Sequence, residues 1–382
     1  MKSIAIFYHD LPLYRFPIFR ELCLCEKLKF TLFSEANSST DIMTINSKFA
    51  HIEIENGGLR WKFIKNIWLF NNKFLWQKGV LKICFSNDFD EYIFLGNAYY
   101  ISTWIATAIL RIRHKKVYFW THGIKKHEKG IKGFIRLIFY HLSNDLLLYG
   151  DVARNLLIKQ GFMPEKLHVI YNSLDTSKQK ELRNTLSKEQ IVTFRSKMFN
   201  NPQFPQIIFI GRLTEKKKLS QIIEALYILK QKGFFLNLLF VGNGEDKQKL
   251  QTLVEEKKIN ENVFFYGASY NEEDNYKLIA SSDLCVSPGE IGLTAMHSLV
   301  YGTPVITHNN FEEQAPEVES IISEFSGCFF EQNNIKDLAD KIESWLTNHI
   351  DKAEIQQNCY SIIDSKYNPE NQKEIICNVL MK

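Results

Sequence analysis

The stretch from Ser282 to His308 constrains the fold of this chain more than any other segment. Leu284–Ser287 is a short apolar run of the kind found in buried strands, and Pro304–Thr307 is a second such run. Between them, Leu293–Tyr301 has the apolar spacing of a helix and is followed by Gly302, a common helix terminator. This order predicts a strand–helix–strand unit of a parallel sheet.

The loop between the first strand and the helix contains Gly289 and Gly292, which permit a tight turn. Backbone N–H groups at the start of the following helix point along its axis and suit a phosphate. Any doubly wound domain contains several such units. This unit therefore indicates a phosphate site only in combination with its neighbours.

The rest of the C-terminal half has the same character. Apolar strands that end in glycine are predicted at Ile207–Gly211, Leu238–Gly242 and Val263–Gly267. The first of them is followed by Arg212, by Lys217 and then by a predicted helix, Leu219–Gln231. With Lys216 and Lys218, four cations therefore stand between a strand and the helix that follows it.

The N-terminal half also alternates strand and helix patterns. Strands are predicted at Ser3–Tyr8, Lys29–Ser34, Tyr92–Gly96, Lys116–Trp120, Asp145–Tyr149 and Leu167–Tyr171. Helices are predicted at Tyr14–Cys25, Phe74–Cys84, Thr103–Ile112, Ile131–Leu142 and Val152–Gln160. Such alternation predicts parallel sheets with helices on both faces, which bind ligands at the carboxyl ends of their strands.

Length and composition fit this organisation. A chain of 382 residues predicts two or three domains, and 45% hydrophobic with 24% charged residues is ordinary for a soluble globular protein. The net charge of +4 is small and does not indicate a nucleic-acid partner. Seven cysteines without paired metal spacing favour a reducing cytoplasm. We expect no signal peptide before the first strand, and no apolar run approaches the roughly 20 residues that span a bilayer.

Several motifs together resemble a known family. GRL-x-x-x-K at Gly211–Lys217, with SPGEIGL and HSLVYGTPV in the Ser282–His308 stretch, resembles the C-terminal domain of retaining glycosyltransferases of family 4. His9–Pro17 (HDLPLYRFP) and Trp120–Gly123 (WTHG) look like a bacterial surface-polysaccharide subgroup. The resemblance covers essentially the whole chain. It implies an α/β GT-B fold, two Rossmann-like domains with parallel sheets that face each other across a cleft.

The resemblance also implies domain boundaries. Asn172–Asp175 is similar to the turn between the two domains of the family, with Ser173 in place of a glycine. Residues 1–175 would form the acceptor-side domain and residues 176–359 the domain that binds the nucleotide sugar. We expect a C-terminal helix at about 360–382 to pack back on the first domain.

The family binds the leaving diphosphate with an arginine and a lysine, which Arg212 and Lys217 match. Arginine offers a planar fork for two oxygens, whereas lysine is a mobile point charge. Lys216 and Lys218 are interpreted as a solvated charge run. The other implied donor-binding residues are Gly211, Gly242, Gly244, Gly289, Ile291, Gly292 and Leu293. No metal ligand is expected, and no cofactor beyond the nucleoside diphosphate sugar that serves as substrate.

The acidic pair of the family, E-x7-E, is altered here. Counting back from Gly302 places Gly289 and His297 at the positions of the two glutamates. Glu290, beside Gly289, is expected to serve the donor hexose after a shift of the loop. His297 either meets the nucleotide ribose through a ring nitrogen or is a core histidine, and the sequence leaves both open.

The N-terminal half carries further candidates. His122 follows a predicted strand end, where the family often keeps a histidine near the donor sugar, and we expect it to be catalytic. Tyr14 and Arg15 are candidates for acceptor binding, since arginine could bind a phosphate or carboxylate. Arg15 is equally consistent with an exposed loop arginine.

Other functions stay open at this stage. Asp88-Phe-Asp90 has the form of a metal-binding carboxylate pair, but it precedes a strand and so lies at the end opposite the ligand-binding edge. We interpret it as a surface segment. A nucleotide-sugar epimerase of related fold and a non-catalytic partner in a polysaccharide assembly complex are the two further alternatives.

The stretch Ile124–Leu142 is basic at its start and then aromatic and aliphatic. Its basic residues are Lys125, Lys126, Lys129, Lys132 and Arg136. Such a helix can lie on an anionic membrane surface or be an ordinary amphipathic helix with its lysines outward.

The hypothesis from sequence is a retaining, metal-independent glycosyltransferase. It would move a sugar from a nucleoside diphosphate to a hydroxyl of a growing surface glycan or of a polyprenyl-diphosphate-linked acceptor, as in capsule or lipopolysaccharide synthesis. We expect it in the cytoplasm, with peripheral contact to the inner face of the cell membrane.

Overall fold

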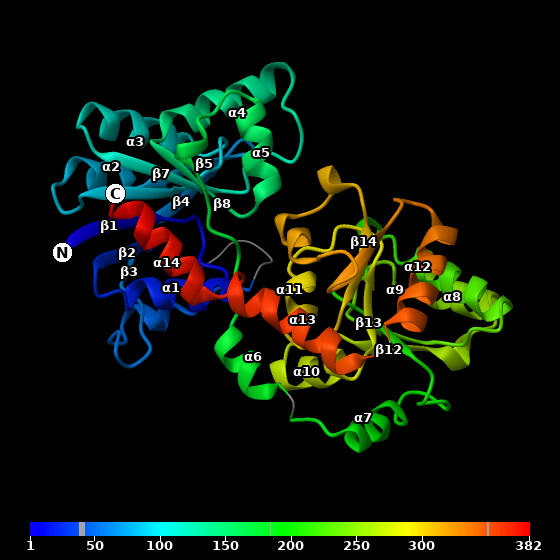
Figure 1. Cartoon of the computed structure of the whole chain (residues 1–382). Helices are drawn as coiled ribbons and strands as arrows, with labels where there is room; N and C mark the ends of the chain where they lie inside the picture. Colours follow the sequence, from blue (N-terminus) through cyan, green and yellow to red (C-terminus); the bar gives the residue numbers. More distant parts are fainter. Residues whose placement is uncertain (38–42, 184, 350) are drawn as a thin grey trace. The chain divides into compact units, whose positions relative to one another are not determined.

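In the computed structural model, the chain forms two compact units, coloured along the sequence in Figure 1. Unit 1 comprises Met1–Asp175 and Asn368–Lys382, and unit 2 comprises Thr176–Tyr367. The structure describes residues 1–37, 43–183, 185–349 and 351–382. Each unit is a parallel sheet with helices on both faces.

The sheet of unit 1 has seven parallel strands in the order β3-β2-β1-β6-β7-β8-β9. Their bounds are β1 Lys2–Phe7, β2 Leu28–Ser34, β3 Trp61–Phe63, β6 Glu91–Leu95, β7 Lys116–Thr121, β8 Asp145–Leu148 and β9 Leu167–Val169. The helices of the unit are α1 Phe16–Cys23, α2 Val80–Phe85, α3 Ile101–Ile112, α4 Gly130–Leu142, α5 Asp151–Lys159 and α14 Pro369–Leu380. Side chains of β1 alternate between the two cores, because successive strand residues point to opposite faces.

One core of unit 1 contains the C-terminal helix. Ile4 and Ile6 of β1 pack in this core with α1 and with Ile376 and Leu380 of α14. The Lys2 ammonium donates to the Leu380 carbonyl oxygen at 2.6 Å, which fixes the end of α14 beside the first strand. The opposite core lies under α2 to α5 and receives Phe7 and its neighbours. The last helix of the chain is thus part of unit 1.

The prediction of a helix over Phe74–Cys84 is wrong in its first half. Phe74–Lys78 is β5, which pairs antiparallel with β4 (Lys65–Leu69), and α2 begins only at Val80. Gly79 separates them with φ +101°, a left-handed conformation that breaks a helix but suits glycine. Leu75 and Gln77 are buried and their neighbours less so, a period of two that marks a strand.

The sheet of unit 2 has six parallel strands in the order β12-β11-β10-β13-β14-β15. Their bounds are β10 Gln206–Ile210, β11 Asn237–Val241, β12 Val263–Gly267, β13 Leu284–Ser287, β14 Val305–His308 and β15 Gly327–Phe330. The helices are α6 Thr176–Leu182, α7 Lys188–Arg195, α8 Ser220–Gln231, α9 Lys247–Glu256, α10 Glu272–Ala280, α11 Thr294–Leu299, α12 Ile335–Asn348 and α13 Lys352–Ser365. The predicted strands of this half are confirmed to within a residue at each end, and the predicted helix over Leu293–Tyr301 is shorter than expected.

The strand order of unit 2 reverses direction between β10 and β13. These strands are direct neighbours, with Ile207 opposite Leu284. In open parallel sheets, ligands bind outside the carboxyl ends of the strands at such a point, because the two loops diverge there and leave a crevice. The loops after β10 and β13 are therefore the expected site of this unit, and they contain the cations and glycines singled out from the sequence.

Candidate functional site

Arg212 stands just beyond β10, at this reversal of strand order. Its side chain is exposed and makes no hydrogen bond or ion pair with any described residue. The next residue, Leu213, is fully buried, and its N–H donates to the Asn243 carbonyl oxygen at 2.9 Å. The backbone at Arg212 is thus held firmly while the guanidinium remains available for an anion.

Close packing of the loops after β10 and β11 explains Gly242 and Gly244. A Cβ on Gly242 would lie 1.8 Å from the Gly211 carbonyl oxygen, and one on Gly244 would lie 2.1 Å from that of Leu213. Gly242 also has φ +146°, which glycine adopts without strain. The role of these glycines is to let the loops touch. Donor contacts of Gly211, Gly242 and Gly244 stay a prediction.

Lys217 connects the loop after β10 to the loop after β13. Its ammonium is half-buried and donates to the backbone carbonyl oxygen of Glu290. Burial lowers the pKa of Lys217, and the nearby Glu290 carboxylate opposes that change. Lys216 is exposed, as expected of a solvated lysine, whereas Lys218 donates to Asn333 Oδ1 at 3.1 Å.

The same contact between loops accounts for Gly289. A Cβ at this position would lie 2.2 Å from the Lys216 carbonyl oxygen and 2.7 Å from the Lys217 Cα. Both are backbone atoms, which cannot move aside without shifting the loop. No side chain fits at Gly289, so the acidic residue of the loop stands at Glu290.

Ile291 was expected to donate its N–H to a phosphate, and in this structure the N–H has a partner within unit 2, so the phosphate contact stays a prediction. The Ile291 N–H donates to Gln314 Oε1 at 2.9 Å. Gln314 is 2% exposed, and its amide group donates to Thr307 Oγ1 at 2.9 Å. No signal in the sequence pointed to this buried glutamine. The neighbouring Gly292 and Leu293 amides remain candidates.

His297 proves to be engaged within unit 2. Its Nε2 lies 2.9 Å from Glu272 Oε1, an atom that also accepts from Tyr301 Oη at 2.5 Å and from Gln179 Nε2 at 2.9 Å. Burial favours the neutral form of Glu272, but the hydrogen bonds from His297, Tyr301 and Gln179 outweigh it and lower the pKa of Glu272 to about 2. Of the two expectations for His297, the structural histidine agrees with these contacts, and the ribose contact stays a prediction.

His122 lies on the loop after β7 and is exposed. Its ring is 4.6 Å from that of Tyr149, centroid to centroid. The turn behind it is fixed, since the Gly123 N–H donates to Thr121 Oγ1 at 3.2 Å and Tyr140 Oη donates to the Gly123 carbonyl oxygen at 3.0 Å. The structure therefore holds the histidine at the carboxyl end of its strand. Its catalytic role stays a prediction.

The interpretation of Arg15 as an exposed loop arginine is wrong, because it is only 3% exposed. Its guanidinium donates to Tyr149 Oη and lies 4.9 to 5.8 Å from four aromatic ring centroids. Those rings belong to Tyr8, Tyr14, Trp120 and Tyr149. Contact of an acceptor with Arg15 would require the aromatic residues to move. Tyr14 is partly exposed and remains the accessible member of this pair of candidates.

The carboxylates of Asp88-Phe-Asp90 lie at the amino end of β6. Both aspartates are exposed, and Asp90 accepts a hydrogen bond from the Ser3 N–H at 2.8 Å. Within the described residues, no group of three or more His, Cys, Asp or Glu side chains is arranged to hold a metal ion. Among the residues that the structure describes, every helix is too short or too polar to cross a membrane.

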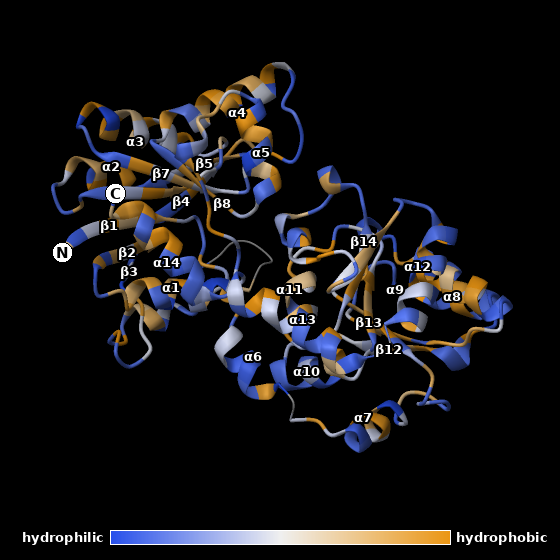
Figure 2. Cartoon of the chain, viewed as in Figure 1, coloured by the Kyte–Doolittle hydropathy of each residue, from blue (hydrophilic) through white to orange (hydrophobic). Residues whose placement is uncertain are grey.

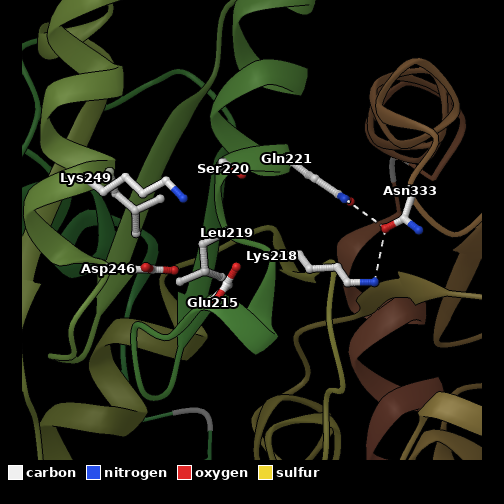
Figure 3. A pocket seen from close by; sticks show the side chains of 9 residues that line it. Glu215, Lys218, Leu219, Ser220, Gln221, Asp246, Lys249 and Asn333 are labelled. Atoms are coloured by element: carbon white, nitrogen blue, oxygen red, sulfur yellow. Dashed lines mark hydrogen bonds between the residues drawn. The ribbon is translucent and has the colours of Figure 1, made fainter.

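A shallow pocket of unit 2 lies beside the candidate site rather than in it (Figure 3). It opens between the start of α8 and α9, and Lys218 and Gln221 converge there on Asn333 Oδ1 at 3.1 and 3.2 Å. Neither Arg212 nor Lys217 lines it. The position of the two loops at the strand reversal is therefore a better guide to the site than the pocket.

Comparisons with known proteins indicate a family for the C-terminal half of the chain. Residues 191–361 match the family model for glycosyl transferases group 1. Glycogen synthase of Leptothrix cholodnii is 34% identical over 110 residues, which cover 28% of this chain and 22% of that protein. Poly(ribitol-phosphate) alpha-N-acetylglucosaminyltransferase of Staphylococcus aureus is 24% identical over 207 residues, or 52% and 41% of the two chains. The chain thus matches less than half the length of either curated relative.

Among solved structures, Anabaena HepE in complex with UDP superposes with a TM-score of 0.74 over 100% of both chains, at 14% identity. At that identity the likeness establishes the fold alone. The expected fold class, two Rossmann-like halves of the GT-B type, is confirmed. Residues 191–361 thus match the glycosyl transferases group 1 family, within a chain of the GT-B fold.

Proposed function

We propose that this chain is a retaining, metal-independent glycosyltransferase that moves a sugar from a nucleoside diphosphate donor to an acceptor hydroxyl. The observation that carries the proposal is the placement of Arg212 and Lys217. One is an exposed, unpaired cation, the other an ammonium held on the loop after β13, and both flank the reversal of strand order in unit 2. The group 1 domain found over residues 191–361 supports the same reaction class.

The chemistry asked of this site is stabilisation of a leaving group. When the glycosidic bond breaks, negative charge grows on the departing diphosphate, and preorganised cations lower the barrier most when they already stand where it develops. Arg212 would bind two phosphate oxygens through its planar fork, and Lys217 would supply a second positive charge. The Lys217 ammonium keeps two further N–H donors while it bonds to Glu290.

The remaining candidates have subsidiary roles in this proposal. Glu290 would bind hydroxyls of the donor hexose. Its backbone carbonyl oxygen accepts a hydrogen bond from Lys217, which holds the loop after β13 close to the proposed phosphate site. His122 would lie near the reacting sugar, and Tyr14 would contribute to acceptor binding. His297 has no donor contact in this scheme and instead stabilises the start of α10 through Glu272.

The acceptor is proposed to be a growing surface polysaccharide or a glycan on a polyprenyl diphosphate. Support comes from the S. aureus relative, whose name specifies a poly(ribitol-phosphate) acceptor and an N-acetylglucosaminyl group. UDP-sugars are the first donors to test, because the matched HepE structure holds UDP. Capsule and lipopolysaccharide synthesis are processes that consume such transfers.

Two stages of experiment test this function. A thermal-shift screen against nucleotide sugars identifies the donor, because a ligand that binds the folded state raises the melting temperature. The selected donor is then incubated with glycan acceptors while free nucleoside diphosphate and the labelled sugar are followed. A transferase releases the diphosphate and attaches the label to the acceptor with the anomeric configuration of the donor retained.

The alternatives give different results in the same assay. An epimerase changes the sugar without labelling any acceptor, and a non-catalytic partner gives neither product. Inversion at the anomeric carbon would also contradict the proposal.

A further inference from the structure

One side of α4 is apolar and exposed. Its large side chains on that side are Ile131, Phe134, Ile135 and Ile138, which are 79%, 64%, 45% and 40% exposed. They are separated by three, one and three positions, a spacing that places them on one face of a helix. The other side of α4 packs on the sheet through Phe139 and Tyr140, which are buried. The four exposed residues thus do not contribute to the core of unit 1.

The neighbouring helix α3 extends this apolar surface. Ile105 and Ile112, two turns apart, are 40% and 79% exposed. The helices are in contact, since the Trp104 ring of α3 lies 5.0 Å from the Phe139 ring of α4, centroid to centroid. Figure 2 shows hydrophobic residues along both helices. We call the six exposed residues of α3 and α4 the α3–α4 face. Single exposed apolar residues are normal, but six of them on two helices in contact are more than chance exposure explains and indicate a binding surface.

Positive charge borders this face at the start of α4. Lys126 and Lys129 lie in the segment before α4 and Lys132 in its first turn, and all three are exposed. None of them forms an ion pair with a described residue, whereas Arg136 is paired with Glu128. An apolar helix face bordered by unpaired lysines is the pattern of helices that lie in the head-group region of anionic membranes.

We propose that the α3–α4 face binds the surface of a membrane that contains anionic phospholipids. The isoleucine and phenylalanine side chains enter the head-group region, and the three lysines bind lipid phosphates. Another protein or a second copy of this chain could cover the apolar residues, but the unpaired lysines favour a dense anionic surface. The proposal goes beyond sugar transfer and does not depend on it.

The test is co-sedimentation of the purified full chain with vesicles. Vesicles of phosphatidylglycerol and phosphatidylcholine should bind the protein, and vesicles of phosphatidylcholine alone should bind it at least about tenfold more weakly, since lysines add to the binding only on anionic lipid. Added salt should weaken binding to the anionic vesicles. The triple variants I131Q/F134Q/I138Q and K126E/K129E/K132E should each reduce the partition coefficient at least about tenfold.

Matched controls come from unit 2. K188E/K197E/K336E makes the same charge change at exposed lysines, and V192Q/F235Q/Y270Q removes exposed apolar side chains. Both controls should bind vesicles like the wild type, and circular dichroism should show all variants folded. Absence of vesicle binding, or equal binding by wild type and both α3–α4 variants, would overturn the proposal. So would light scattering that shows a dimer abolished by I131Q/F134Q/I138Q without any vesicle binding.

Discussion

His297 Nε2 lies 2.9 Å from Glu272 Oε1 and joins the start of α10 to α11. The family resemblance places a glutamate at position 297, where a carboxylate would face Glu272 across this distance. Two carboxylates so close repel each other, so the histidine and Glu272 form a compatible pair. The exchange of glutamate for histidine is thus explained by a contact within unit 2.

The first prediction concerns this pair. His297→Ala leaves the partly buried Glu272 carboxylate without one of its donors, and we expect a loss of about 1–3 kcal/mol of unfolding free energy. His297→Glu should destabilise more, because it adds a like charge, and His297→Gln should destabilise least, because an amide N–H can still donate. Chemical denaturation measures the series. Equal stability of the Glu variant and the wild type, with weaker donor binding by the Ala variant, would instead support a ribose contact.

The second prediction follows from the pKa of about 2 for Glu272 in the folded chain, below its usual value of 4.5. A carboxyl group with a lowered pKa stabilises the fold above its unfolded pKa and loses that contribution as the pH falls toward the folded value. The wild type should therefore exceed Glu272→Gln in stability by up to about 3 kcal/mol at neutral pH. Denaturation at several pH values should show this difference constant above about pH 5 and shrinking between about pH 4.5 and pH 2. A difference that grows on acidification would contradict the assignment.

How far the sequence specified the fold differs between elements. Strands β10, β11, β13 and β14 of unit 2 were predictable because each is a short apolar run that is buried on both faces. The hairpin of β4 and β5 was not, because Phe74–Cys84 contains enough apolar residues to fit a helix and the alternation of Leu75 and Gln77 is too short to decide. Gly79, which follows the strand, was the only signal in the sequence that the segment is not one continuous helix.

The sequence placed the candidate residues on loops after predicted strands but did not specify the atoms to which they bond. Arg212 and the Gly289–Gly292 loop lie at one edge of the sheet because β10 pairs with β13, two strands that are not consecutive in the chain. Which atoms they bond depends on residues far along the chain. Gln314 accepts the hydrogen bond of the Ile291 N–H, and Glu272 is the partner of His297. Neither residue belongs to a sequence motif that would have identified it. The burial of Arg15 likewise depends on rings at the carboxyl ends of β1, β7 and β8, strands of one sheet that are far apart in the sequence.

The third prediction tests the reason for Gly289. Gly289→Ala should cost at least about 2 kcal/mol, because its Cβ would overlap the backbone of Lys216 and Lys217. Gly292→Ala is the matched control in the same loop. Its Cβ meets no atom within 4 Å, so only the strain of φ +58° remains, about 1 kcal/mol. Equal loss in both variants, measured by denaturation, would show that the close approach of the loops is not what requires glycine.

The fourth prediction concerns metal dependence. If Arg212 and Lys217 neutralise the diphosphate, transfer should continue in excess chelator at a rate within about twofold of the untreated rate, a difference below about 0.5 kcal/mol in the barrier. The measurement is acceptor labelling after metal stripping. Complete loss of labelling that manganese or magnesium restores would contradict the metal-independent mechanism and return attention to Asp88 and Asp90.

The last prediction concerns the two cations of the proposed phosphate site. Arg212→Ala and Lys217→Ala should each lower turnover by a factor of about a hundred or more, the loss typical of one preorganised contact to a developing charge. Lys216→Ala, which removes the exposed neighbour, should change turnover by less than about twofold, within about 0.5 kcal/mol. Melting temperatures should show that Arg212→Ala is folded like the wild type.

The most direct test of the account is the rate of acceptor-dependent nucleoside diphosphate release by Arg212→Ala, measured at saturating donor beside Lys216→Ala. The Arg212 side chain is exposed and bonds to no described residue, so its loss should not disturb the fold. For Arg212→Ala, the account predicts a rate about a hundredfold below that of the wild type. For Lys216→Ala, it predicts a rate within about twofold of the wild type. A near-normal rate for Arg212→Ala in a folded chain would contradict the claim that this arginine stabilises the leaving diphosphate.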